Sequence, residues 1–223
     1  MTKSIIVALD EYEQIQFDKL LDQLDPNLCM VKVGSVSFNS LGRESILKAA
    51  HKGFDIFLDL KLHDIPNTVR KSIEGLSDLP IKMMTVHVSG GIKMLKESIK
   101  ASKDTNIKIF GVTALTSLAD DDANLIYSRN TKEQVLAMIQ LAKKSGIHGV
   151  VCSPQELSLV KNNSDLMTIT PGIRIKDLGD DQERTMTPKE AIDNGSDFLV
   201  IGRPITKSIN VKNSLQEIHD SIQ

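Results

Sequence analysis

The 223-residue sequence contains only two cysteines, Cys29 and Cys152, and no tryptophan. Two cysteines cannot form a disulfide framework or a four-ligand zinc site, and both lie in apolar runs, so we expect buried, reduced thiols. No stretch approaches the roughly 18 apolar residues that a membrane-spanning helix needs. The N-terminal segment MTKSIIVALD lacks the apolar region and cleavage site of a signal peptide. We therefore expect a soluble cytoplasmic protein.

The chain also lacks an excess of charge of either sign. Lys and Arg number 27 against 29 Asp and Glu, which gives a net charge of −2. This balance gives no electrostatic reason to expect nucleic acid or an anionic membrane as a partner. Arginine is scarce beside lysine, so each arginine is a candidate for planar, bidentate binding of a carboxylate or phosphate.

Short apolar runs alternate with longer amphipathic stretches along the whole chain. The runs are rich in Val and Ile and mostly lack polar alternation, which is typical of parallel strands buried on both faces. We predict eight strands, at Ser4–Leu9, Leu28–Val33, Phe54–Leu60, Met83–Val88, Ile107–Val112, Gly149–Cys152, Met167–Thr170 and Phe198–Ile201. Predicted helices include Tyr12–Leu24, Arg43–His51, Asn67–Leu76, Ile92–Ala101, Lys132–Lys144 and Pro188–Asp193. Thr131 precedes one of these helices as a candidate N-cap.

The number of repeats decides between two α/β folds. Eight βα units favour a closed (β/α)8 TIM barrel, with one domain spanning residues 1–223, over an open doubly wound sheet. No G-x-G-x-x-G follows the first strand and no G-x-x-x-x-G-K-[ST] occurs, which also counts against a nucleotide-binding open sheet.

Charged residues stand where the predicted strands end, which is where TIM barrels carry their chemistry. Asp10 ends the first strand, Lys32 lies within the apolar second strand, and Asp59, Lys61 and Asp64 follow at the end of the third. An unpaired lysine between two valines would be costly to bury. We therefore interpret Lys32 as part of an inward-facing charge network, rather than as a lysine that reaches solvent from an exposed strand.

Lys61 lies two residues from Asp59 in an extended segment, so the two side chains are expected on the same face. Carboxylates beside an ammonium favour its protonated form. A protonated lysine suits a proton donor and a partner for a developing anion, whereas a Schiff-base nucleophile needs a neutral amine. A surface ion pair is the alternative, but the position at a strand end near Lys32 and Asp10 favours a functional site.

The segment after the last strand carries a candidate phosphate site. Gly202 supplies accessible backbone N–H groups and Arg203 one guanidinium, in the region where these barrels often bind phosphate. The polar stretch Gly172–Met186 is long enough to form a mobile lid. The five histidines show no metal-ligand spacing, and we interpret His87 as a hydrogen-bonded core residue.

Four sequence blocks occur in order: DLKLHDIPNT, TVHVSGG, TPGIR with DDQER, and GRPIT. Together they resemble the bacterial type of the orotidine 5′-phosphate decarboxylase family, and the similarity runs from Asp10 to Thr206. The resemblance implies a (β/α)8 homodimer with shared active sites. It also implies conversion of the nucleotide orotidine 5′-monophosphate to uridine 5′-monophosphate and CO2, the last step of pyrimidine biosynthesis, without a metal or organic cofactor.

The resemblance also implies residue roles. Lys61 would donate a proton to C6 of the pyrimidine, with Lys32, Asp59 and Asp64 completing its charged network. Asp10 and Lys32 would bind the ribose hydroxyls. The phosphate would be bound by Gln182, Gly202 and Arg203, with Arg174 beside the phosphate site. Asp64, Ile65 and Thr68 would reach the active site from the partner subunit. The family also has a side-chain hydroxyl that contacts the pyrimidine, which Thr116 would supply here, with Ser117 as the alternative.

Two other functions are compatible with parts of this pattern. A magnesium-dependent branch of the same superfamily shares D-x-K-x-x-D but carries a carboxylate metal ligand on strand two, where this chain has Lys32, which would repel Mg2+. A catalytically inactive barrel that binds a nucleotide could have lost Lys61 or Asp59. All four network positions are filled, so the sequence does not favour that rival.

Overall fold

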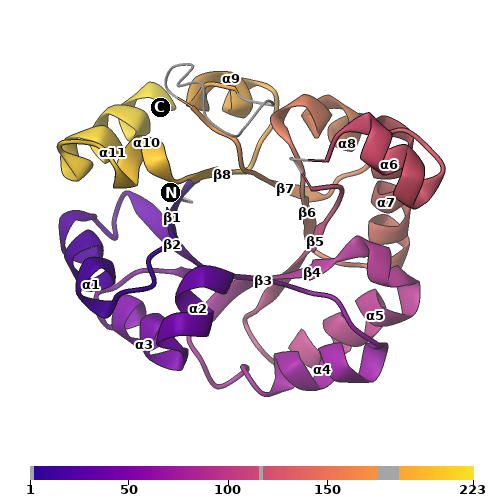
Figure 1. Cartoon of the computed structure of the whole chain (residues 1–223), viewed down its shortest axis with the longest axis horizontal. Coiled ribbons are helices and arrows are strands. Elements are labelled where there is room, and N and C mark those ends of the chain that lie inside the picture. The colour runs from indigo at the N-terminus through magenta and orange to yellow at the C-terminus, as the bar shows by residue number, and fades with distance from the viewer. Residues whose placement is uncertain (1–2, 116–117, 175–185) are drawn as a thin grey trace.

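The computed structural model describes residues 3–115, 118–174 and 186–223. Eight parallel strands close into a barrel in sequence order, and helices surround it (Figure 1). The strands are β1 (Ile5–Leu9), β2 (Cys29–Gly34), β3 (Ile56–Leu62), β4 (Ile81–His87), β5 (Lys108–Val112), β6 (Gly149–Val151), β7 (Met167–Thr170) and β8 (Phe198–Ile201). The predicted (β/α)8 barrel is confirmed, and every predicted strand is present with its ends shifted by at most two residues.

The outer layer contains more helices than the sequence patterns predicted. The α-helices in the described part of the chain are α1 (Gln14–Gln23), α2 (Ser35–Leu41), α3 (Arg43–His51), α4 (Pro66–Glu74), α5 (Gly91–Ser102), α6 (Asp120–Tyr127), α7 (Thr131–Ser145), α8 (Leu157–Asn163), α9 (Pro188–Asp193), α10 (Arg203–Thr206) and α11 (Val211–Ser221). Short 3-10 turns occur at Val88–Gly90 and Pro154–Glu156. The predicted cap of α7 is wrong by one residue. Asn130 is the N-cap, because its side chain accepts from the Glu133 N–H at 2.9 Å and Thr131 is already helical.

Strand alternation divides the buried residues into two cores. The larger core lies between strands and helices, and it includes the fully buried thiol of Cys29, whose pKa burial raises to about 12. Burial also raises the pKa of Cys152, so the prediction of buried thiols is confirmed. The smaller core fills the barrel and comprises Ile6, Met30, Phe57, Met83, Phe110, Ile169 and Phe198.

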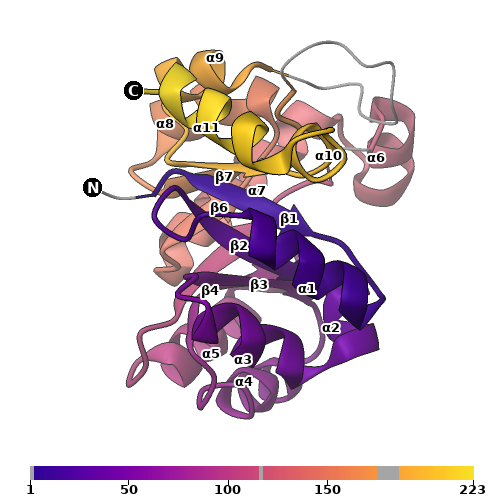
Figure 2. The same ribbon diagram turned by 90° about the vertical axis from the view of Figure 1, so that its left-hand side faces the viewer.

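The inner core sets the positions of the charged residues above it. Because side chains two apart on a strand share a face, Lys32 follows Met30 and Asp59 follows Phe57 on the inside of the barrel. Figure 2 shows both chain ends at one end of the barrel, with α2 at the opposite end. Across the described ranges, no helix is long and apolar enough to cross a bilayer.

Candidate active site

A cavity of about 570 Å3 opens at the carboxyl ends of the strands. Its lining comes from β1, β2 and β3 on one side and from the ends of β6, β7 and β8 on the other. The charged residues among its described lining are Asp10, Glu11, Lys32, Asp59, Lys61, Arg174, Arg203 and Lys207. Five of these side chains are cationic and three are anionic, which favours an anionic small molecule as ligand.

Lys32, Asp59 and Lys61 form a connected charge network inside this cavity. The Lys32 ammonium lies 2.8 Å from Asp10 Oδ1 and 3.9 Å from Asp59 Oδ2. The Lys61 ammonium lies 2.7 Å from the same Asp59 Oδ2. The side chains of Lys32 and Asp59 are about nine-tenths buried, whereas those of Lys61 and Asp10 reach solvent. The inward network predicted from the sequence is therefore present, and a ligand can reach Lys61 and Asp10.

The backbone at Lys61 departs from the regular strand assumed above. Leu58 pairs with Met84 and Leu62 pairs with Val86, so residues 59–61 of β3 lie opposite Thr85 alone. Lys61 has a φ of 51°, in the left-handed region that few residues other than glycine adopt. The two side chains still meet, as predicted, but through a bulge and not through a continuous strand.

Gly34 allows the close approach of Lys32 and Asp10. A Cβ at this position would lie 2.8 Å from Lys32 Nζ and 3.3 Å from Asp10 Oδ1. Gly34 was not among the predicted site residues, although a glycine two positions after the charged residue of a buried strand is a signal that could have found it.

Ser37 is a second missed residue, because it holds the backbone on both sides of Asp10. Its fully buried hydroxyl lies within hydrogen-bond distance of the carbonyl oxygens of Leu9 and Glu11, and it accepts from the Glu11 N–H at 3.2 Å. The segment that carries Asp10 is thereby tied to α2.

Arg174 and Arg203 bring guanidinium groups to the β7 and β8 side of the cavity, as predicted. Arg174 is buried, and its guanidinium donates to the Ile173 carbonyl at 3.0 Å. Arg203 is exposed at the first turn of α10, directly after Gly202. Gly172 turns the chain out of β7 with a φ of 81°, which requires a glycine.

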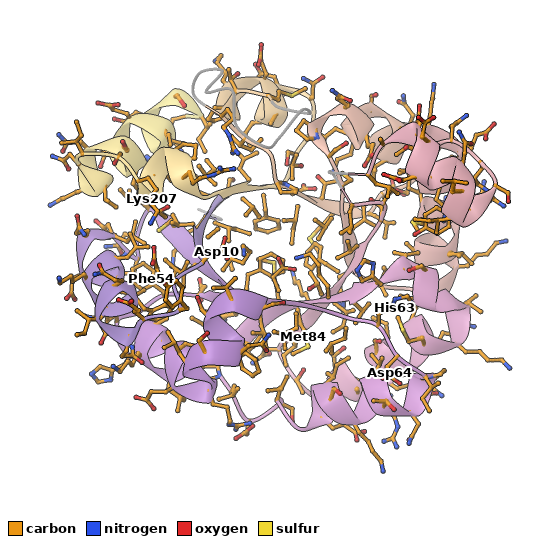
Figure 3. All side chains as sticks on the ribbon, in the orientation of Figure 1. Asp10, Phe54, His63, Asp64, Met84 and Lys207 are labelled. Atoms are coloured by element: carbon orange, nitrogen blue, oxygen red, sulfur yellow. The ribbon has the colours of Figure 1, made fainter. Side chains whose placement is uncertain are left out.

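Six predicted site residues are not found in the described lining of this cavity, counting Ser117 as the alternative to Thr116. Gln182, Thr116 and its alternative Ser117 lie outside the described residues, as does most of the predicted lid, residues 175–185. Asp64, Ile65 and Thr68 are exposed and do not line the cavity of their own chain. Figure 3 shows Asp64 beside α4, across the barrel from Asp10 and Lys207.

The interpretation of His87 as a hydrogen-bonded core residue is wrong. Its ring is half-buried and contacts the His63 ring at a centroid distance of 5.2 Å, and within the described ranges it has no hydrogen-bond partner. Burial, followed by the nearby His63 and Lys61, lowers the pKa of His87, so this imidazole is neutral near pH 7.

Comparison with known proteins gives consistent matches. A family model described as "Orotidine 5'-phosphate decarboxylase / HUMPS family" matches residues 3–218. A curated protein named orotidine 5'-phosphate decarboxylase, from Actinobacillus pleuropneumoniae serotype 5b, is 45% identical over 235 residues and covers 100% of both chains. The crystal structure of the Lactobacillus acidophilus protein of that name has a TM-score of 0.87 and 36% identity, with full coverage of both chains. An orotidine 5'-monophosphate decarboxylase from Methanocaldococcus jannaschii, complexed with inhibitor BMP, shares the fold with a TM-score of 0.82 and 20% identity over 100% of both chains.

Proposed function

Since the chain belongs to the orotidine 5'-phosphate decarboxylase / HUMPS family, we propose that it converts orotidine 5′-monophosphate to uridine 5′-monophosphate and CO2. The observation that carries this proposal is the Lys32–Asp59–Lys61 network in the strand-end cavity. The reaction belongs to pyrimidine biosynthesis, and the cytoplasmic location expected from the sequence stays a prediction.

The chemistry centres on Lys61. The bond between C6 and the carboxylate breaks, its electron pair stays on C6, and CO2 leaves. The pyrimidine ring cannot delocalise this carbanion as an enolate would, so a fixed cation beside C6 is the effective stabiliser. Lys61 supplies that cation and then donates its proton to C6. Its partial exposure lets solvent return the proton.

Asp59 and Lys32 keep Lys61 ready for this step. The Asp59 carboxylate lies 2.7 Å from the Lys61 ammonium and holds it at the cavity. Lys32, held by Asp10 and Asp59, balances the negative charge of the cluster. In the bound complex, Asp59 faces the substrate carboxylate.

The remaining contacts anchor the rest of the nucleotide. Asp10, half-exposed beside Lys32, suits hydrogen bonds to ribose hydroxyls. Gly202 and Arg203, with Arg174 close by and Gln182 from the segment outside the described residues, bind the phosphate. Thr116 is proposed to contact the pyrimidine.

We propose that the working form is a homodimer in which Asp64, Ile65 and Thr68 enter the cavity of the partner subunit. Their exposure on one chain supports this arrangement: Ile65 is 66% exposed although it is a large apolar residue. The proposal also gives Asp64 a role that it does not have within its own chain.

The proposal is tested by following the ultraviolet absorbance of orotidine 5′-monophosphate with purified protein. Turnover that persists after prolonged EDTA treatment is the expected result. The ammonium of Lys32 stands between Asp10 and Asp59, where the magnesium-dependent rival needs a metal ligand. Loss of turnover with EDTA and its return with Mg2+ would favour that rival, and binding of the product nucleotide without turnover would favour the inactive barrel.

A further inference from the structure

Thr85 of β4 joins the two residues on which the proposed chemistry depends. Its side chain is fully buried. Its hydroxyl donates to Asp59 Oδ1 at 2.9 Å and accepts from the Lys61 backbone N–H, also at 2.9 Å. A single hydroxyl thus bridges a carboxylate and a backbone donor of the neighbouring strand.

The first bond fixes the carboxylate of Asp59. Asp59 Oδ2 faces the ammonium groups of Lys61 and Lys32, at 2.7 and 3.9 Å, and Oδ1 faces Thr85. A partial rotation of the carboxylate about its terminal torsion would lengthen both the Thr85 hydrogen bond and the Lys61 contact, because these lie on opposite oxygens. The hydroxyl therefore helps to fix the plane in which the Asp59 carboxylate faces the lysines.

The second bond fixes the backbone of Lys61. Residues 59–61 bulge away from the regular β3–β4 pairing, and Lys61 adopts a left-handed conformation. A bulge leaves backbone groups without their ladder partners. The Thr85 oxygen accepts the N–H of Lys61 at this point and so holds the residue in a conformation it would otherwise leave.

We propose that Thr85 is a positioning residue for the decarboxylation, which aims the Asp59 carboxylate and the Lys61 side chain through one hydroxyl. This inference rests on the proposed function. Thr85 does not line the described part of the cavity, so it acts through Asp59 and Lys61.

The chain offers a matched control in Thr168. This residue is also a fully buried strand threonine whose hydroxyl donates to an aspartate, Asp197 Oδ2 at 2.9 Å, and accepts from a backbone N–H, that of Asp197 at 3.1 Å. It does not line the described cavity. Thr168→Val removes hydrogen bonds of the same kind, together with a longer one to the Gly195 carbonyl at 3.3 Å, without touching the proposed site.

The experiment compares Thr85→Val, Thr85→Ser and Thr168→Val for kcat, KM, melting temperature and the dissociation constant of uridine 5′-monophosphate. We expect kcat of Thr85→Val to fall at least about tenfold while product affinity changes less than about threefold. Thr85→Ser, which retains the hydroxyl, is expected within about threefold of wild-type kcat. Thr168→Val is expected to lower the melting temperature but keep wild-type kcat.

Either of these kinetic results would overturn the proposal: a Thr85→Val kcat within threefold of wild type, or a Thr168→Val loss of kcat as large as that of Thr85→Val. If Thr85→Val does not fold, Thr85→Ala is compared with Thr85→Ser, since these differ only in the hydroxyl; equal kcat values would again overturn it.

Amide hydrogen exchange separates failure of this inference from failure of the proposed function. The Lys61 N–H should exchange at least about tenfold faster in Thr85→Val or Thr85→Ala than in Thr85→Ser, whether or not the wild type turns over orotidine 5′-monophosphate. Wild-type protein without turnover refutes the proposed function alone. Unchanged exchange at Lys61 refutes the positioning role.

Discussion

The Gly34→Ala substitution tests the charge network without removing any charged group. The new methyl group would lie 2.8 Å from Lys32 Nζ, and ordinary contact begins near 3.4 Å, so the ammonium must move by about 0.6 Å. The same methyl group approaches Asp10 Oδ1 to 3.3 Å. The hydrogen bond between Lys32 and Asp10, now 2.8 Å long, cannot keep its geometry.

The size of the effect follows from the bond that is lost. A hydrogen bond to a charged group contributes about 1.5–3 kcal/mol. If the ligand depends on this pair, kcat/KM should fall by about tenfold to a hundredfold, at roughly 1.4 kcal/mol per factor of ten. The backbone of Gly34 has a φ of −99°, which alanine adopts freely. Backbone strain therefore adds nothing, and we expect the free energy of unfolding to fall by no more than the lost bond contributes, about 1.5–3 kcal/mol.

Steady-state turnover of orotidine 5′-monophosphate, followed by ultraviolet absorbance, and thermal melting measure the two effects separately. Gly75→Ala is the control, since Gly75 also has a negative φ (−67°) and lies outside the described cavity lining. A Gly34→Ala kcat/KM within twofold of wild type, or equal to that of Gly75→Ala, would refute the reasoning that this network needs a glycine at position 34.

Four further outcomes are expected. Lys61→Ala should lower kcat far more than product affinity, because the ammonium acts on charge formed in the transition state; retention of more than about a tenth of wild-type turnover contradicts its role as proton donor. Mixing inactive Lys61→Ala and Asp64→Asn dimers should restore activity, because the hybrid contains one site with both wild-type residues. Hybrids that co-purify by tag but stay inactive contradict the shared site. Arg203→Ala should raise KM for the nucleotide and leave the nucleoside orotidine unaffected; equal damage to both substrates indicates a role in folding. Cys29 should resist a thiol reagent near pH 8 in the native protein and react once unfolded, because burial raises its pKa to about 12 and only the thiolate reacts. Rapid labelling of the native protein contradicts that burial.

Much of the fold could be predicted because the strands of a parallel barrel are buried on both faces and therefore occur in the sequence as apolar runs. The eight runs, their spacing and the polar residues at their ends gave the barrel and the positions of Asp10, Lys32 and Asp59. α2 was missed because its sequence, SVSFNSL, is rich in serine and has little apolar periodicity.

The parts of the site that could not be predicted depend on the register between strands. Thr85 looks like any buried strand threonine until the irregular β3–β4 pairing places it opposite residues 59–61. Nothing in the motif D-x-K indicates that Lys61 has a positive φ. Ser37 acts on the Asp10 segment only because α2 folds back beside the end of β1. Such contacts arise from tertiary structure, and a local sequence pattern does not contain them.

The left-handed backbone of Lys61 also bears on how the sequence can evolve. Lysine in this conformation costs about 1–2 kcal/mol relative to glycine, so selection for stability alone disfavours it. A protein from a duplicated gene that is no longer selected for catalysis would gain stability if this lysine were replaced by glycine or asparagine. Under the role proposed for Lys61, a lysine at this position indicates selection for activity, and among homologous barrels its presence should distinguish active enzymes from inactive ones.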